Sequence, residues 1–88
     1  MKKLDMEKIE EAMKRMIPSV DKSARLEAVV LEENEVRVIV AKGTQSDRAT
    51  FSAELLDDFL KKGIKGQEVR KGIGKVISKL NRASQKRG

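Results

Sequence analysis

Two alternating apolar stretches in the middle of the chain restrict its fold more than any other feature. Within residues 24–31, and again within residues 36–41, apolar side chains recur at every second position, and β-branched residues dominate the second stretch. This alternation is typical of half-buried strands. The connection between them, Glu32-Glu33-Asn34-Glu35, is short and entirely polar. Because so short a connection joins antiparallel neighbours, the sequence predicts a β-hairpin.

The length of the hairpin loop decides which side chains share a face of the sheet. A three-residue loop over residues 33–35 places the two alternating sets on one face, whereas a two-residue loop places them on opposite faces. We favour the longer loop, because it gives one continuous apolar face. The two sets are Leu26, Ala28 and Val30 in the first strand and Val36, Val38 and Val40 in the second. Residues 42–47 are expected to form a loop, and residues 48–51 a short third strand.

Helical periodicity precedes the predicted hairpin. From Asp5 to Met16, apolar residues recur every three or four positions, which places them on one face of a helix. Asp5 is a suitable N-cap, since its carboxylate can accept a hydrogen bond from a free backbone N–H of the first turn. Pro18 restricts the residue before it to extended conformations, so we expect the helix to end there.

Two further helices are expected after the hairpin. Ser52 is the predicted N-cap of the first and Gly63 its predicted end, and the second spans residues 67–83. Gly72 and Gly74 inside the second helix mark close packing, a kink or a turn. We therefore predict an α+β domain over residues 1–84, with residues 85–88 as a frayed basic tail. A two- to three-stranded antiparallel sheet would be covered on one face by the helices.

The composition argues against catalysis. The 88 residues include no His, Cys, Trp or Tyr, which removes imidazole bases, thiolate nucleophiles and the usual zinc ligands. The acidic pairs are adjacent residues such as Asp57-Asp58, which point about 100° apart on a helix and do not converge on one substrate atom. We therefore expect no enzyme activity, no metal and no cofactor.

The sequence also indicates a cytoplasmic protein without membrane contact. No stretch approaches the ~18 apolar residues that a membrane-spanning helix needs. Met1-Lys2-Lys3-Leu4 is followed at once by acidic residues, so no signal peptide is expected. The absence of cysteine fits a reducing compartment.

Charge is concentrated in the last part of the chain. The chain carries 20 Lys/Arg and 14 Asp/Glu, yet residues 65–88 hold eight basic side chains and only one acid, Glu68. On a helical projection, five of the basic side chains fall within an arc of about 80°, opposite the apolar stripe, and span roughly 22 Å. This predicted basic stripe consists of Lys71, Lys75, Lys79, Arg82 and Lys86, with Lys65 and Arg70 at its near end.

A row of cations of one sign favours a ligand with regularly spaced negative charge. Nucleic-acid phosphates are the commonest such ligand, so we expect binding to RNA or to DNA without sequence preference. Lys42 and Arg48 form a second, weaker basic spot. Two alternatives remain open: a merely solvated helix face, and a non-enzymatic interaction module. Such a module would meet an acidic protein with its basic face or self-associate through a sheet edge.

Two short motifs resemble turns of nucleic-acid-binding families. Gly63-Ile64-Lys65-Gly66 resembles the GxxG turn of K-homology RNA-binding domains, and the predicted order helix–strand–strand–helix–GxxG–helix is similar to one arrangement of that family. The resemblance implies that this turn clamps a nucleic-acid backbone. Gly72-Ile73-Gly74-Lys75, followed by Ser78, resembles the hairpin of helix-hairpin-helix DNA-binding motifs. That resemblance implies a break in the last helix, with backbone N–H groups offered to a phosphate.

Overall fold

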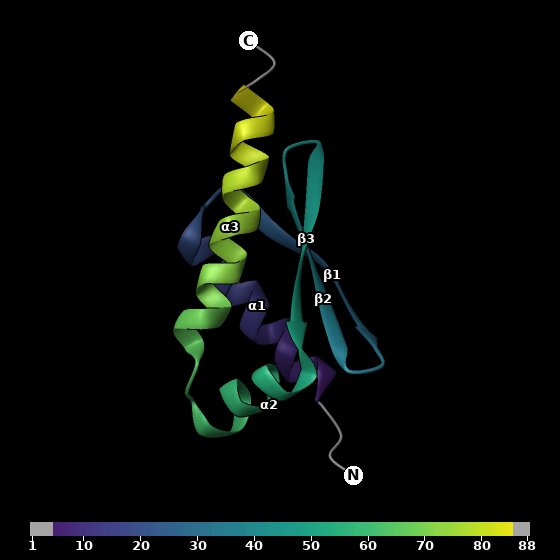
Figure 1. The fold of residues 1–88 in the computed structure, drawn as a ribbon. Helices are drawn as coiled ribbons and strands as arrows, with labels where there is room; N and C mark the ends of the chain where they lie inside the picture. Colours follow the sequence, from purple (N-terminus) through teal and green to yellow (C-terminus); the bar gives the residue numbers. More distant parts are fainter. Residues whose placement is uncertain (1–4, 86–88) are drawn as a thin grey trace.

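A three-stranded antiparallel sheet lies at the centre of the protein, with one helix before it in sequence and two after it. The computed structural model describes the backbone of residues 5–85 and the side chains of residues 5–82. Within this range the predicted α+β class is confirmed, and the strands lie in the order β1-β2-β3 (Figure 1). The elements are α1 (Met6–Val20), β1 (Ala24–Glu32), β2 (Glu35–Lys42), β3 (Gln45–Ser52), α2 (Ala53–Lys62) and α3 (Gly66–Gln85).

The turn of the first hairpin is shorter than predicted. Glu32 pairs with Glu35, so only Glu33 and Asn34 form the loop, and Glu33 adopts a positive φ of 55°. Two-residue turns whose backbone matches the twist of the strands require positive φ values of this kind. The prediction of a three-residue loop is therefore wrong.

A β-bulge reconciles the short turn with a buried apolar face. The register of β1 shifts between Leu26 and Ala28, which inserts one extra residue and reverses the alternation beyond it. Leu26 lies opposite Val40 on the face that the helices cover, as predicted. Ala28 and Val30 lie on the opposite, open face, so their predicted placement beside the valines is wrong. Val30 is 44% exposed.

The third strand begins earlier than the sequence indicated. Lys42 pairs with Gln45, so Gly43 and Thr44 alone form the second turn, and Gly43 has a φ of 65°. Most of residues 42–47, which we expected to be a loop, therefore belongs to β2 and β3. Polar side chains hide this part of β3 in the sequence, because an edge strand needs little apolar surface to pair with its neighbour.

Helix α1 continues past Pro18, where we expected it to end. Its predicted N-cap is confirmed, since Asp5 Oδ1 accepts a hydrogen bond from the Lys8 backbone N–H at 3.3 Å. Pro18 lies in the last turn, where it removes a single backbone donor. The Asp21 N–H donates to the Ile17 carbonyl at 3.0 Å, and Ile17 is fully buried. Burial of Ile17 and this closing bond hold the last turn in helical form.

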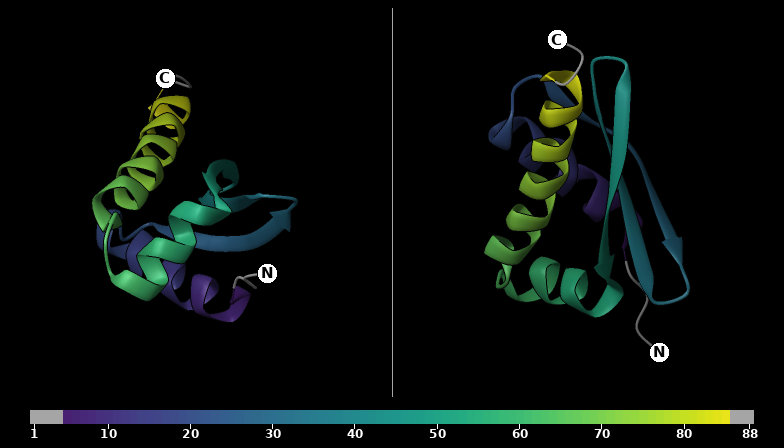
Figure 2. Two further views of the ribbon diagram at one scale, coloured as in Figure 1. Left: turned by 60° about the horizontal axis from the view of Figure 1, so that its bottom comes forward. Right: turned by 45° about the horizontal axis from the view of Figure 1, so that its top comes forward.

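One hydrophobic core fills the space between the helices and one face of the sheet. Because buried side chains from all three helices join the same cluster, the helices cover a single face, as predicted (Figure 2). Its centre is the three valines of β2, which are fully buried. The helices contribute Ile9, Met13, Ile17, Leu56, Val69, Ile73, Val76, Ile77 and Leu80.

The caps of α2 are those that the sequence predicts. The Ser52 hydroxyl accepts a hydrogen bond from the Leu55 backbone N–H at 3.1 Å, and Gly63 ends the helix with a left-handed φ of 67°. The GxxG segment therefore joins two helices, as its resemblance to K-homology domains implies. The K-homology arrangement named above has two strands between its first two helices, whereas this chain has three, because β3 lies before α2.

Helix α3 runs unbroken through both of its glycines to Gln85. It therefore contains no turn of the helix-hairpin-helix type, and it is three residues longer than predicted, one at its start and two at its end. A Cβ at Gly72 would lie 2.5 Å from Cε1 of Phe51, so glycine is needed there for α3 to pack on β3. A Cβ at Gly74 would meet nothing within 4 Å. Of the predicted basic tail, residues 86–88 lie outside the described residues.

Candidate nucleic-acid interface

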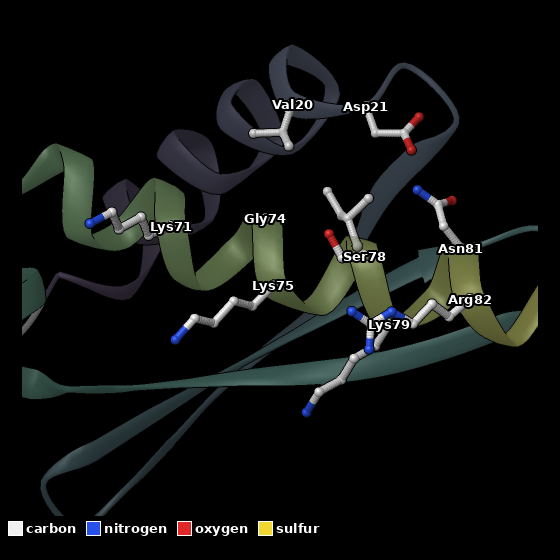
Figure 3. Close-up of a pocket in the computed structure, with 10 residues that line it drawn as sticks. Val20, Asp21, Lys71, Gly74, Lys75, Ser78, Lys79, Asn81 and Arg82 are labelled. Atoms are coloured by element: carbon white, nitrogen blue, oxygen red, sulfur yellow. The ribbon is translucent and has the colours of Figure 1, made fainter.

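The outward side of α3 presents a row of exposed basic side chains. Lys71, Lys75, Lys79 and Arg82, which we call the α3 row, lie on the side of the helix opposite its buried residues. At 1.5 Å per residue the row spans roughly 16 Å. Lys75 and Lys79 extend to the same side of the helix (Figure 3). These four residues are the part of the predicted basic stripe that the structure brings together.

None of the four side chains of the α3 row forms an ion pair with a carboxylate among residues 5–82. Their charges are therefore available to an external anion. This follows from the sequence of α3, which places Glu68 in the first turn and no further acid in the helix. In most exposed helices, acids one turn away from the lysines neutralise such a face.

The two residues predicted at the near end of the stripe have partners inside the protein. Lys65 Nζ lies 3.4 Å from Asp58 Oδ2, and the Lys65 backbone has a left-handed φ of 65°. Arg70 Nη1 lies 3.4 Å from the hydroxyl of Ser19, and its Nη2 lies 3.5 Å from the Ser19 carbonyl. Neither belongs to the α3 row. Lys86, at the far end of the stripe, lies outside the described residues.

A shallow groove runs beside the α3 row, between α3 and the end of α1. Its volume is about 860 Å³, and Val20 and Asp21 line it on the α1 side (Figure 3). On the α3 side it is lined by the whole α3 row. A smaller hollow of about 380 Å³ adjoins it, because the two share Val20, Lys71 and Gly74. Cations and an open groove thus occupy the same surface.

Small residues of α3 line the groove between the cations. Gly74 and Ser78 lie one helical turn apart, and both line it. The side chain of Ser78 is exposed and offers a hydroxyl that can donate or accept. The sequence marked both residues only through the resemblance to a helix-hairpin-helix turn, which the unbroken helix does not form. The available signal is a glycine in the middle of an otherwise regular amphipathic helix.

A polar network closes one end of the groove. Lys42 Nζ lies 2.5 Å from Asp21 Oδ2 and also donates to the side-chain oxygen of Asn81. The hydrogen bond from Lys42, followed by one from the Ser23 backbone N–H, holds the pKa of Asp21 below its usual 3.8. Asp21 therefore stays ionised, and the charge of Lys42 offsets its own.

This network fixes the orientation of the Asn81 side chain at the wall of the groove. Since Lys42 donates to its oxygen, the NH₂ group of Asn81 keeps its donors for other partners, and it lies on the side of Ser78 (Figure 3). Sequence reasoning missed Asp21 and Asn81, because the network joins residues 21 and 39 positions apart. It also placed Lys42 and Arg48 in one basic spot. Lys42 is bound inside the network, and Arg48 lies on the open face opposite Ile39.

Two other kinds of feature are absent from the described residues. Within residues 5–82, no group of three or more acidic side chains is placed to hold a metal ion. No helix in the described range has both the length and the apolar character that crossing a membrane requires.

Comparison with known proteins gives no match. No protein-family model, no curated protein and no solved structure is significantly similar to the chain. Function is therefore inferred from the geometry and charge of the described residues.

Proposed function

We propose that the protein binds the phosphate backbone of nucleic acid through the α3 row. The supporting observation is that four exposed cations, all without a carboxylate partner in the described part of the chain, line one side of a continuous helix beside a groove. Phosphates neutralised by Lys and Arg release condensed counterions, which supplies much of the free energy of such binding. Binding of this kind needs no catalytic group, and we assign the protein no enzyme activity.

The aromatic content favours backbone contacts over base stacking. Phe51 and Phe59 are the only aromatic residues of the chain. Phe51 is buried, and Phe59 packs against the core. Proteins that hold single strands generally stack bases on exposed aromatic rings. We therefore propose sequence-independent contact with phosphates of RNA or DNA, in the cytoplasmic location that the absence of cysteine suggests.

An acidic protein is the alternative partner for the same row. Self-association through the β1 edge is disfavoured, because the bulge between Leu26 and Ala28 and the exposed Glu27 interrupt that edge. Both an acidic protein and a nucleic acid would contact the α3 row through their negative charge. Binding measurements with nucleic acid decide between them.

Fluorescence anisotropy tests the proposal directly. Labelled mixed-sequence duplex DNA, duplex RNA and the matching single strands are titrated with the protein at about 50 mM salt. We expect micromolar binding to the duplexes, independent of their sequence. Absence of binding to any of these nucleic acids would contradict the proposal and would direct attention to acidic protein partners.

Two charge-matched variants locate the interface. Reversing Lys75, Lys79 and Arg82 to glutamate should weaken duplex binding at least about 100-fold, since three phosphate contacts become repulsive. Reversing Lys61, Lys62 and Lys65 changes the net charge by the same amount on α2 and the turn after it, and most of the binding should remain. Circular dichroism checks that both variants fold. Equal losses in the two variants would show that net charge, and not the α3 row, drives binding.

A further inference from the structure

We propose, on the basis of the proposed function, that a phosphodiester group of a duplex enters the groove at Gly74. One strand would then be held between α3 and the end of α1, and would not merely lie across the tips of the α3 row. The observations that lead to this are the groove itself, the donors around Gly74 and the absence of any packing reason for a glycine there.

Gly74 differs from Gly72, two positions earlier in the same helix. At Gly72 a side chain would collide with the Phe51 ring, so packing accounts for that glycine. At Gly74 a Cβ would meet nothing within 4 Å, and the backbone has no positive φ that favours glycine. A glycine inside a helix is destabilising relative to alanine. Glycine is also the residue that lets a ligand come close to the backbone.

The side chains around Gly74 are donors suited to a phosphate. Lys71 lies one turn before it and Ser78 one turn after it, and both line the groove. Lys75, next to Gly74, also lines the groove, and its side chain extends to the side of α3 away from Val20 and Asp21 (Figure 3). The free NH₂ group of Asn81 lies beyond Ser78 (Figure 3). Phosphate oxygens accept from ammonium, hydroxyl and amide donors alike. Asp21 is the carboxylate that lines the groove, and Lys42 already neutralises it.

A duplex strand fits this groove better than a free phosphate or a flexible single strand. The α3 row runs on from Gly74 for two further turns along the same groove, so neighbouring phosphates of the same rigid backbone can contact Lys79 and Arg82. Without exposed aromatic rings, a single strand would have to lose conformational freedom with no stacking in return. We call the proposed phosphate position in the groove at Gly74 the phosphate seat. Inorganic phosphate would contact this seat alone and gain nothing from the rest of the α3 row.

Substitution of Gly74 separates the effect on the fold from the effect on the ligand. Gly74→Ala adds a methyl group to empty space in the free protein and improves helix propensity, so the Tm should rise by about 4–8 °C. The same methyl group occupies the phosphate seat. Duplex affinity should therefore fall about ten-fold, the equivalent of one lost charge-assisted contact. Gly74→Leu should weaken binding further.

Gly72→Ala is the matched control. Its added methyl group meets the Phe51 ring on the buried side, so the Tm should fall while the folded variant keeps its duplex affinity. Thermal unfolding and anisotropy are measured on all three variants, with duplex DNA, duplex RNA, single strands and inorganic phosphate as probes.

The possible outcomes separate this inference from the proposed function. A more stable Gly74→Ala variant with weaker duplex binding supports the seat. Unchanged duplex affinity in Gly74→Ala and Gly74→Leu would overturn the seat, while loss of binding on reversal of the α3 row would still support the proposed function. A lower Tm for Gly74→Ala would overturn it as well, because glycine would then have a packing role. Tighter binding of single strands than of duplexes would overturn the choice of ligand.

Discussion

The end of α2 and the outer side of α3 are neighbouring basic regions, but within the described residues carboxylates neutralise the cations of the first and not those of the second. At the end of α2, Lys61 and Lys62 lie 3.4 Å and 3.9 Å from the carboxylates of Asp57 and Asp58, and Lys65 shares Asp58. On α3 the four cations of the α3 row have no such partner among residues 5–82. The number of basic residues therefore does not define an anion site. What matters is whether a carboxylate lies one turn away.

Ser78→Glu should give the α3 row an acid one turn from its cations, as the lysines of α2 have. A glutamate at this position lies one turn before Arg82 and close to Lys75, in the i,i+4 arrangement that pairs the α2 lysines. We expect about a ten-fold loss of duplex affinity from the added charge, together with a stability gain of about 0.3 kcal/mol. Ser78→Gln, of equal size but neutral, is the control: it loses the same hydroxyl and adds the same bulk, so the ten-fold loss is measured relative to it. Equal affinities of the two variants, measured by anisotropy, would contradict the electrostatic explanation.

Lys42→Met tests whether duplex binding needs Lys42 to neutralise the Asp21 carboxylate beside the groove. The substitution keeps most of the length of the side chain, removes its ammonium group and leaves the charge of Asp21 without its partner. Duplex affinity should fall about three-fold through repulsion of phosphate, although Lys42 itself contacts no ligand. The double variant Lys42→Met with Asp21→Asn should regain the affinity of the natural chain. If the double variant binds as weakly as the single one, Lys42 acts as a direct contact.

The same ion pair should make stability depend on acid pH. Because the folded pKa of Asp21 is lowered, the pair contributes stability above the unfolded value near 3.8, and this contribution is lost as the pH falls through the folded pKa. Urea unfolding of the natural chain and of Asp21→Asn, at pH 7 and below pH 3.8, measures it. The natural chain should be the more stable at pH 7, and the difference should shrink in acid. A difference that does not change with pH would show that the ion pair has no such role.

Asp58→Asn should have the smallest effect and tests the α2 side of the comparison. It removes the carboxylate that Lys62 and Lys65 share. Exposed pairs of this kind contribute about 0.3–0.5 kcal/mol each and two are removed, so stability should fall by no more than about 1 kcal/mol. Duplex affinity should rise less than about two-fold, because the released cations do not lie in the α3 row. A larger gain in affinity would extend the interface to the turn between α2 and α3.

The parts of the fold that the sequence predicts are those set by local signals. The caps at Asp5 and Ser52, the end of α2 at Gly63 and the amphipathic length of α3 depend on residues a few positions apart. The bulge in β1 was not predictable, because it depends on the register against β2.

The candidate site divides in the same way. The α3 row follows from helical spacing and was predicted in full within the described residues. The pairing of Lys65 with Asp58 and the network of Lys42 with Asp21 and Asn81 were not. These contacts are set by where the turns between elements bring the chain, and residue spacing within one helix carries no information about that.

The salt dependence of duplex binding tests the central claim most directly. The Kd of the natural chain for duplex DNA is measured between about 50 and 200 mM salt, and again after neutralising Lys75, Lys79 and Arg82 to glutamine. Four phosphate contacts predict that the logarithm of the binding constant changes with the logarithm of the salt concentration with a slope of about −3.6. Each residue neutralised should make this slope less negative by about 0.9. A slope near zero, or a steep slope that the three substitutions leave unchanged, would contradict phosphate binding by the α3 row.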